Sequence, residues 1–332
     1  MKLHEGLHVA TFQDGRTEIC AGMETMLSFP NHPRKRTRLV QTLAKGISRS
    51  DYFQFAKNLG VGRTEAQEIL TQLHRAELLT IREPRLDAGP EESLWKRIGG
   101  NAMQETYRQR SRLKVSLNRD TFLTRLLGAE LARAGIGTLR VSAEDGNMNH
   151  ADESRESVAF KSLIQGLGFG TSVTPPRGKV DLAVQLSWGF PDPLAAASAM
   201  RRNIAHLPVV AGNDYIEIGP LVVPGLTPCV ACVSNHRREF YPDMLEHAVS
   251  LLEVEFPRLE TSLATAGAAL AGSMALAFLD HRAIASGQVT RVDVDGGIEV
   301  MTYDTHPDCA CCELPMDIEV PEEPRFSRRK VS

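Results

Sequence analysis

The sequence lacks the features that mark membrane, secreted and nucleic-acid-binding proteins. Its 332 residues carry a formal net charge of −3, so no global basic excess attracts nucleic acid or an anionic membrane. The opening MKLHEGLHVATFQDG has no long apolar run of the kind found in a secretory signal. No stretch approaches the roughly 20 strongly apolar residues of a membrane span. We therefore expect a cytoplasmic protein with no membrane and no nucleic-acid partner.

Cysteine is also scarce, with six residues, but its distribution is uneven. Cys20 stands alone, TPCVACV holds Cys229 and Cys232, and HPDCACC holds three cysteines within four positions. In a reducing compartment such clusters are more often metal ligands or redox groups than disulfides. Two Cys-x-x-Cys hooks, formed by Cys229 with Cys232 and by Cys309 with Cys312, predict one zinc ion held by four thiolates.

Four cysteine ligands make the predicted zinc structural, because they leave no coordination position for water or substrate. The hooks are separated by residues 233–308, 76 residues, so the ion would tie together two distant parts of one domain. Cys311 could replace a neighbouring ligand, lie buried as a small hydrophobe, or form a redox pair with Cys312. His306 could also bind zinc, although a turn histidine before Pro307 is the simpler interpretation.

The sequence pattern of residues 1–84 predicts a small domain of strands followed by helices. LHVATFQDG and TEICAGMETMLSF alternate apolar and polar residues around turn signals, which predicts a hairpin that ends at Pro30. Helical spacing follows over 34–46, 48–60 and 62–79. This order is typical of a winged-helix-like unit. Residues 85–111 are charged and interrupted by Pro and Gly, which predicts a linker.

Residues 112–318 show a different pattern, in which short apolar runs alternate with helical stretches. LKVSL, TLRVSA, VDLAVQLS and LPVVAGND predict strands of a mostly parallel sheet, and TFLTRLLGAELARAG predicts a helix between two of them. The small-residue stretch SLATAGAALAGSMALAFLDHRAIASG predicts a buried or dimer-interface helix rather than a membrane span. Residues 319–332 predict a polar tail. The expected fold class is therefore α/β.

Three segments of this second domain resemble a known superfamily. DLAVQLSWGFPDP, IEIGPLVVPGLTPCVACV and THPDCACC are similar to the ThiF/MoeB proteins, which have a Rossmann-type, ubiquitin-activating-like fold. They resemble in particular the ThiF-like proteins of peptide natural-product gene clusters, over about residues 112 to 315. By pattern and domain order, residues 1–84 resemble the peptide-recognition domain that precedes the fold in such proteins.

The resemblance implies a protein that binds the leader of a ribosomal precursor peptide and delivers it to a YcaO-type cyclodehydratase, which makes azolines. It also implies a homodimer, and a leader docked between the last strand, 24–29, and the third helix, 64–73. Polar or acidic leader residues would meet basic and amide side chains such as Arg75. Met26 and Phe29 would line an apolar groove, with Ile69 and Leu73 on its opposite wall. A plainer interpretation is that Ile69 and Leu73, at helical spacing, belong to the core. The predicted peptide contacts are Met26, Phe29, Arg63, Gln67, Leu70 and His74.

Adenylating members of the superfamily bind nucleotide phosphate at a glycine-rich loop after the first strand. Here VSLNRDTFLTRLLGAEL has no glycine before Leu126, and residues 118–121 occupy the loop. We expect these side chains to block phosphate, and Asp120 to repel it. The family's ribose-binding aspartate falls on Ala143, and its following Asn-Arg motif is absent. Zinc is thus the expected cofactor, and ATP is not.

The sequence therefore predicts a non-adenylating scaffold with no catalytic residues of its own. It would act by raising the effective concentration of the core peptide beside a separate enzyme. Two alternatives stay open. An ATP-dependent adenylating enzyme acting on a peptide is the first, and for it Asp145 and Asp181 could retain magnesium or could be solvated turn groups. A DNA-binding regulator is the second, suggested by the basic run HPRKRTR at 32–38.

Overall fold

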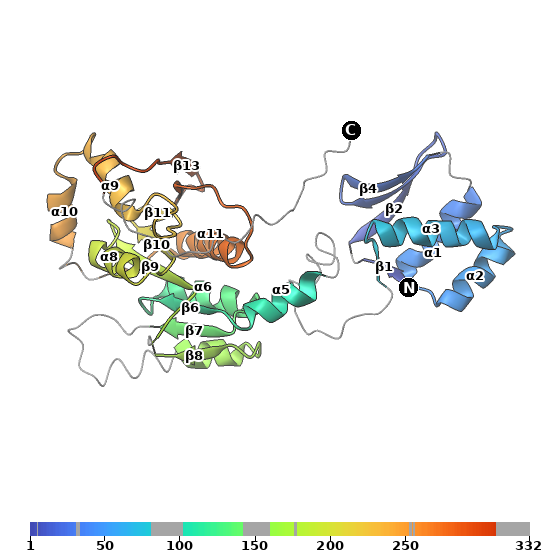
Figure 1. Cartoon of the computed structure of the whole chain (residues 1–332), viewed down its shortest axis with the longest axis horizontal. Helices are drawn as coiled ribbons and strands as arrows, with labels where there is room; N and C mark the ends of the chain where they lie inside the picture. Colours follow the sequence, from blue (N-terminus) through green and yellow to red (C-terminus); the bar gives the residue numbers. More distant parts are fainter. Residues whose placement is uncertain are drawn as a thin grey trace. The chain divides into compact units, whose positions relative to one another are not determined.

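The computed structural model describes residues 1–4, 6–30, 34–80, 102–141, 160–175, 178–251, 254 and 256–309. The chain divides into two compact units, residues 1–107 and 108–332, which are described one at a time (Figure 1). The boundaries predicted at 84 and 111 stay predictions.

In its described residues up to 80, unit 1 contains a three-stranded antiparallel sheet in the order β2-β3-β4, together with three helices. The two-residue strands β1 and β5 pair with each other. All three helices expected from the apolar spacing are present. The elements are β1 (Lys2–Leu3), β2 (Leu7–Thr11), β3 (Thr17–Ala21), β4 (Glu24–Phe29), α1 (Arg34–Lys45), α2 (Arg49–Asn58), α3 (Arg63–Arg75) and β5 (Leu79–Thr80).

The helices of unit 1 form because their apolar residues recur on one face and bury a common core. Leu39 and Leu43 of α1 are fully buried, as is Leu73 of α3. The Ser48 side chain caps α2 by accepting a hydrogen bond from the backbone N–H of Asp51. These contacts place the leucines of α3 mainly in the core, as the plainer interpretation of their spacing has it.

Unit 2 is built on a mixed sheet, and its described part has eight strands in the order β13-β12-β11-β10-β9-β6-β7-β8. The strands from β10 to β8 are parallel, whereas β11, β12 and β13 pair antiparallel. The mostly parallel α/β sheet is thus confirmed. The elements are α5 (Ala102–Arg110), which begins in unit 1 and ends in unit 2, β6 (Lys114–Leu117), α6 (Phe122–Arg133), β7 (Thr138–Val141), β8 (Ser172–Thr174), β9 (Leu182–Trp188), α8 (Pro193–Arg201), β10 (His206–Ala211), β11 (Tyr215–Ile218), α9 (Val230–Arg238), α10 (Met244–Ser250), α11 (Thr261–Leu279), β12 (Gln288–Asp293) and β13 (Ile298–Thr302).

The chain winds outward in two directions from the centre of this sheet. From β6 it passes through α6 to β7, and from β9 it passes through α8 to β10, on the other side of the β6–β9 pair. Right-handed crossovers then place α6 and α8 on opposite faces of the sheet. The strand order reverses between β6 and β9, and ligands of open α/β sheets bind in the crevice beyond the carboxyl ends of such strands.

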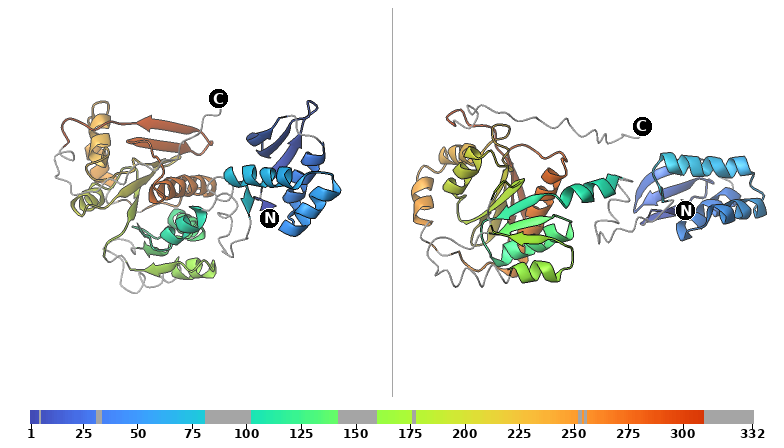
Figure 2. Two further views of the ribbon diagram at one scale, coloured as in Figure 1. Left: turned by 45° about the vertical axis from the view of Figure 1, so that its right-hand side comes forward. Right: turned by 60° about the horizontal axis from the view of Figure 1, so that its bottom comes forward.

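Helix α11 lies beside α6 and covers the sheet (Figure 2). Its small residues permit this approach, because a Cβ at Gly267 would collide with Ile216 and one at Gly272 with the Glu130 carboxylate. By length and composition α11 is the one helix of the described residues that could cross a membrane, but half of its most apolar window is buried inside the unit. It therefore serves as a core helix of unit 2.

The end of the predicted linker is part of unit 2. Residues 102–110 form α5, and Arg110 is fully buried although the sequence places it in a basic, linker-like run. Its guanidinium donates two hydrogen bonds to the Asp280 carboxylate, at 2.8 and 2.7 Å, and a third to the carbonyl oxygen of Ala134, at 2.8 Å. A buried charge with three such partners ties α5 to the ends of α11 and α6.

Candidate functional site

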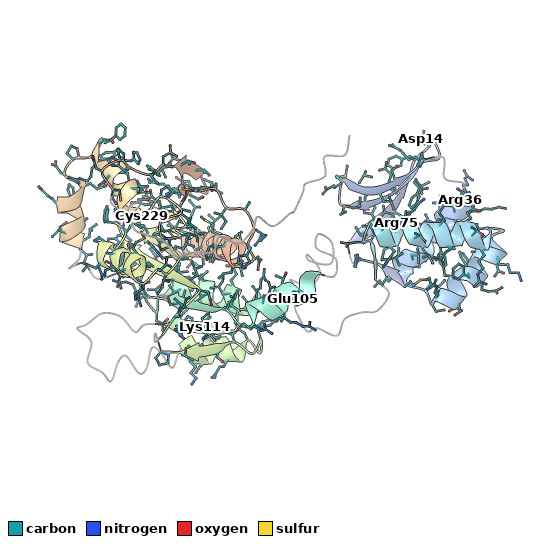
Figure 3. The ribbon with its side chains drawn as sticks, viewed as in Figure 1. Asp14, Arg36, Arg75, Glu105, Lys114 and Cys229 are labelled. Atoms are coloured by element: carbon teal, nitrogen blue, oxygen red, sulfur yellow. The ribbon has the colours of Figure 1, made fainter. Side chains whose placement is uncertain are left out.

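Three cysteines from distant parts of the sequence meet at the start of α9. Cys229 is the N-cap residue of α9, Cys232 lies in its first turn, and Cys309 follows β13. The Cys229 Sγ lies 3.8 Å from that of Cys232 and 3.6 Å from that of Cys309. Figure 3 labels Cys229. The three sulfur atoms fall within 4.8 Å of one another.

These distances fit zinc. A tetrahedral ion with Zn–S bonds of about 2.3 Å has sulfur–sulfur edges of about 3.8 Å, whereas a disulfide needs about 2.05 Å. Cys229 and Cys232 are buried, and the α9 N-terminus favours negatively charged thiolates. The predicted fourth ligand, Cys312, and its neighbour Cys311 lie outside the described residues. Cys20 is buried in β3 of unit 1.

His306 lies at the other end of α9 and is not among the cysteines. Its Nε2 is 3.2 Å from Oε1 of Glu239, and its ring centroid is 4.8 Å from that of His236. Residues 304–309 thus run beside α9, with Cys309 near the start of the helix and His306 near its end.

Side chains occupy the start of α6 in the crevice beyond β6 and β9, and a cavity of about 290 Å³ borders Leu117 and Asn118 beside them. Asn118 bridges the two strands, since its amide group donates to the Leu186 carbonyl oxygen at 2.9 Å and accepts from the Leu186 N–H at 2.7 Å. Thr121 caps α6, and its side chain forms a reciprocal capping box with Thr124. A backbone N–H at the helix terminus, where a phosphate would bind, is therefore already paired.

Asp120 behaves differently from the sequence expectation. Its carboxylate is buried and accepts two hydrogen bonds from Arg125, at 2.7 and 3.1 Å. The predicted repulsion of phosphate by Asp120 is therefore offset by a bidentate pair within the loop. The loop is occupied as expected, but it is occupied by a neutral pair rather than by a free negative charge.

Of the two acidic residues considered for magnesium, Asp181 lies away from this crevice. Asp181 accepts a hydrogen bond from the backbone N–H of Lys114, at 2.8 Å, where β6 and β9 begin (Figure 3). This is the edge opposite the crevice, because the two strands are parallel. Ala143 and Asp145 lie outside the described residues.

A cavity of about 540 Å³ lies between α8 and α9, beside Cys229 and Cys309. Its wall includes His206, which is fully buried. Burial lowers the pKa of His206, against the opposing effect of a hydrogen bond with the Ile204 carbonyl oxygen. The sequence carries no signal for this cavity, since its wall combines residues from three separate segments.

A smaller cavity of about 270 Å³ lies between the end of β4 and α3 in unit 1. Of the predicted peptide contacts, Phe29 borders it, and Ile69 borders it from α3. Apart from Pro30, the rest of the wall is polar. We call it the β4–α3 cavity; it is lined by Ser28, Phe29, Pro30, Arg36, Glu65, Glu68, Ile69 and Gln72.

The predicted polar contacts lie on a different face of α3. The Arg63 guanidinium stacks over the Phe53 ring at 5.2 Å, and Gln67 accepts a hydrogen bond from Arg49, at 3.2 Å, so both side chains contact α2. Leu70 and His74 follow at helical spacing, but Leu70 is buried in the core of unit 1, whereas His74 is exposed. Glu65 and its neighbours in the cavity point roughly the opposite way, because residues two apart on a helix differ by about 200°.

Comparison with known proteins establishes the fold. No protein-family model and no curated protein sequence matches the chain. Solved structures do: E. coli MccB with selenomethionine MccA is 14% identical over 94% of this chain and 99% of that one, with a TM-score of 0.64. The chain shares the fold of MccB. The structure of E. coli MccB with ATP is 13% identical, with the same coverage and TM-score. PaaA is 14% identical over 75% of this chain and 95% of that one, with a TM-score of 0.55.

The likeness to MccB confirms the ThiF/MoeB-like fold expected of unit 2. Because it spans 94% of the chain, it includes unit 1 as well as unit 2. At this identity it establishes the fold alone.

Proposed function

We propose that this chain binds the leader of a ribosomal precursor peptide and presents the core to a separate, YcaO-type cyclodehydratase. Unit 1 is the winged-helix-like recognition domain, and unit 2 is a zinc-stabilised ThiF-like scaffold that does not adenylate. The shared fold with MccB supports this setting, because MccB is a microcin C7 biosynthetic enzyme whose structure has been determined in complex with N-formylated MccA. The gain in rate comes from effective concentration.

The occupied N-terminus of α6 is the observation that carries the non-adenylating part of the proposal. A phosphate at the N-terminus of α6 would have to displace the Thr121 cap and the Asp120–Arg125 pair. It would also meet Asn118, which is held by two hydrogen bonds. Glycine loops bind phosphate because they bring none of these side chains.

Strand β4 is the proposed docking edge for the leader. In the described part of unit 1, β4 pairs with β3 alone, so its outer edge can accept another strand. An added peptide strand would gain main-chain hydrogen bonds, and one of its side chains would enter the β4–α3 cavity. Glu68 in this wall is exposed, which favours a basic or amide leader side chain there rather than the acidic one first expected.

The zinc ion completes the proposal for unit 2. Cys229, Cys232 and Cys309 have the spacing of three tetrahedral ligands, and we assign Cys312 as the fourth. The ion holds the residues after β13 against α9. Homodimerisation is also part of the proposal, and light scattering tests it by giving twice the chain mass of 36.5 kDa.

Peptide binding by paired variants tests the proposal. The ligands are fluorescent peptides encoded by short reading frames beside the gene, and the readout is anisotropy with the full-length chain. Glu68→Ala with Gln72→Ala, in the cavity wall, should weaken binding at least about tenfold. The matched control, Gln67→Ala with His74→Ala on the other face of the same helix, should change affinity less than about twofold. Equal losses in both, or a loss confined to the control pair, would contradict docking at the β4–α3 cavity.

An adenylating enzyme is the second candidate. It is favoured by the shared fold with MccB, which has been solved with ATP and with AMPCPP. In that case the Asp120–Arg125 pair would open on nucleotide binding and free Arg125 for phosphate. Saturable binding of Mg-ATP separates this candidate from the scaffold.

A further inference from the structure

A second group of metal-ligating side chains lies along the same seam as the cysteines. His236 and Glu239 are at the end of α9, and His306 lies in the segment that runs beside it. From the pair Cys229 and Cys232, this group is about seven residues along α9, or roughly 10 Å at 1.5 Å per residue. It is therefore separate from the cysteine site.

The helix places two of these ligands together. His236 and Glu239 are three residues apart, so their side chains project from the same face of α9, one turn apart. The carboxylate of Glu239 is 57% exposed, whereas the His306 ring is 8% exposed. The group thus has a buried inner ligand and an outer ligand in contact with solvent.

His306 is oriented by a backbone hydrogen bond. The N–H of Asp308 donates to Nδ1 of His306 at 3.1 Å, so that nitrogen is an acceptor. Its Nε2 therefore carries either a proton or a metal ion, and it lies 3.2 Å from Oε1 of Glu239. A ligand–ligand distance of about 3.3 Å is the edge of a tetrahedron with metal–ligand bonds of about 2.05 Å.

His236 is oriented in the complementary way. Its Nε2 lies 3.1 Å from the carbonyl oxygen of Asp304, and because a carbonyl only accepts, Nε2 carries the proton. The lone pair of the neutral ring is then on Nδ1. A second nitrogen fixed to a carbonyl is the usual arrangement around a metal-bound histidine. The ligand atoms of His236, Glu239 and His306 all lie within 4.8 Å of one another.

We propose that His236, Glu239 and His306 bind a divalent transition-metal ion such as Zn²⁺, separate from the ion of the cysteine site. Two imidazoles and a carboxylate suit zinc, cobalt or nickel and leave at least one position for water. A structural ion would be fully enclosed by protein ligands, but this one would be hydrated on the exposed side of Glu239. The ion would fasten the end of α9 to the segment after β13.

Cobalt titration of the metal-free, full-length chain under reducing conditions tests this inference, because cobalt reports its ligands. Cobalt bound by thiolates gives an intense sulfur-to-metal charge-transfer band, and cobalt bound by nitrogen and oxygen does not. The wild-type chain should bind two equivalents, one with the band and one without it. Glu239→Gln should weaken the second equivalent more than about 100-fold, since even partners that only orient ligands are worth about 10- to 100-fold.

The control and the second variant separate ligand loss from misfolding. Glu246→Gln, an exposed residue of the neighbouring α10, should retain both equivalents. His306→Ala should lose the band-free equivalent, and if this buried position impairs folding, the exposed Glu239 variant decides. A band-free equivalent without any thiolate-bound cobalt would support this site and refute the proposed cysteine ligands. The inference is overturned if the wild type binds only thiolate-bound cobalt, or if Glu239→Gln keeps both equivalents.

Discussion

Removal of zinc should destabilise unit 2 by an amount set largely by chain connectivity. The proposed ion joins Cys232 to Cys309 across 76 intervening residues, 233–308. Closing a loop of this length restricts the unfolded chain by about 4.5 kcal/mol in the cross-link model. The energy of the zinc–thiolate bonds is a separate contribution, and the full effect follows the affinity of the folded chain for zinc. For a domain of this size, 4.5 kcal/mol corresponds to roughly 9–18 °C in unfolding temperature.

Calorimetric unfolding with and without a zinc chelator, under reducing conditions, measures this effect. The sheet core should stay folded without metal, because it contains no zinc ligand, but its transition should move down by at least about 9 °C. A Cys229→Ser, Cys232→Ser double variant should already unfold at the lower temperature and show no further shift with chelator. An unchanged unfolding temperature in the wild type would refute the zinc tie and the tetrahedral interpretation of the sulfur distances.

Two further predictions concern stability. Asp280→Ala should lower the free energy of unfolding by about 3–5 kcal/mol, because it leaves the buried Arg110 charge without its bidentate partner. Urea unfolding measures this change, and a loss below about 1 kcal/mol would show that the pair is not buried in solution. Hydrogen bonds from the Ser262 hydroxyl and from the backbone N–H groups of Ser262 and Leu263 lower the pKa of Glu260 to about 2. Its stabilisation of α11 should therefore be complete above about pH 4.3 and be lost as pH falls toward 2, and Glu260→Gln should flatten this part of the pH profile of unfolding.

Much of the fold follows from local patterns. The apolar runs of β6, β9 and β10 predict a parallel sheet because each is short and separated from the next by a helix. The three helices of unit 1 follow from apolar residues at helical spacing and from the Ser48 cap. The close approach of Cys229, Cys232 and Cys309 was also predictable, because the sequence has few clustered cysteines and together they suit one metal ion.

Other features depend on contacts that no local pattern encodes. The sequence places Arg110 in a basic linker, and only the fold brings its buried partner Asp280, 170 residues away, into contact with it. The loop charge of Asp120 is offset by Arg125 one helical turn later, and this pairing depends on where α6 begins. The packing of α2 decides which face of α3 meets β4. Arg63, predicted to contact the peptide, therefore lies against Phe53 of α2 instead of facing β4.

The His–Glu group was missed for the same reason. The sequence marks His306 as a possible zinc ligand, but it gives no sign of its partner Glu239, which is 67 residues away. Its neighbour in the structure is set by the path of the chain after β13. The signal that could have identified the group is a histidine close to each cysteine segment: His236 lies four residues after Cys232, and His306 lies three residues before Cys309.

Calorimetric titration of zinc-replete, full-length protein with Mg-ATP tests the central claim most directly, because it decides between scaffold and adenylating enzyme without knowledge of the substrate. The account predicts no saturable heat at millimolar nucleotide, since Asn118, Thr121 and the Asp120–Arg125 pair occupy the phosphate position. Saturable binding of one nucleotide per chain would contradict it. That result would mean that the loop opens and that unit 2 is an adenylating enzyme.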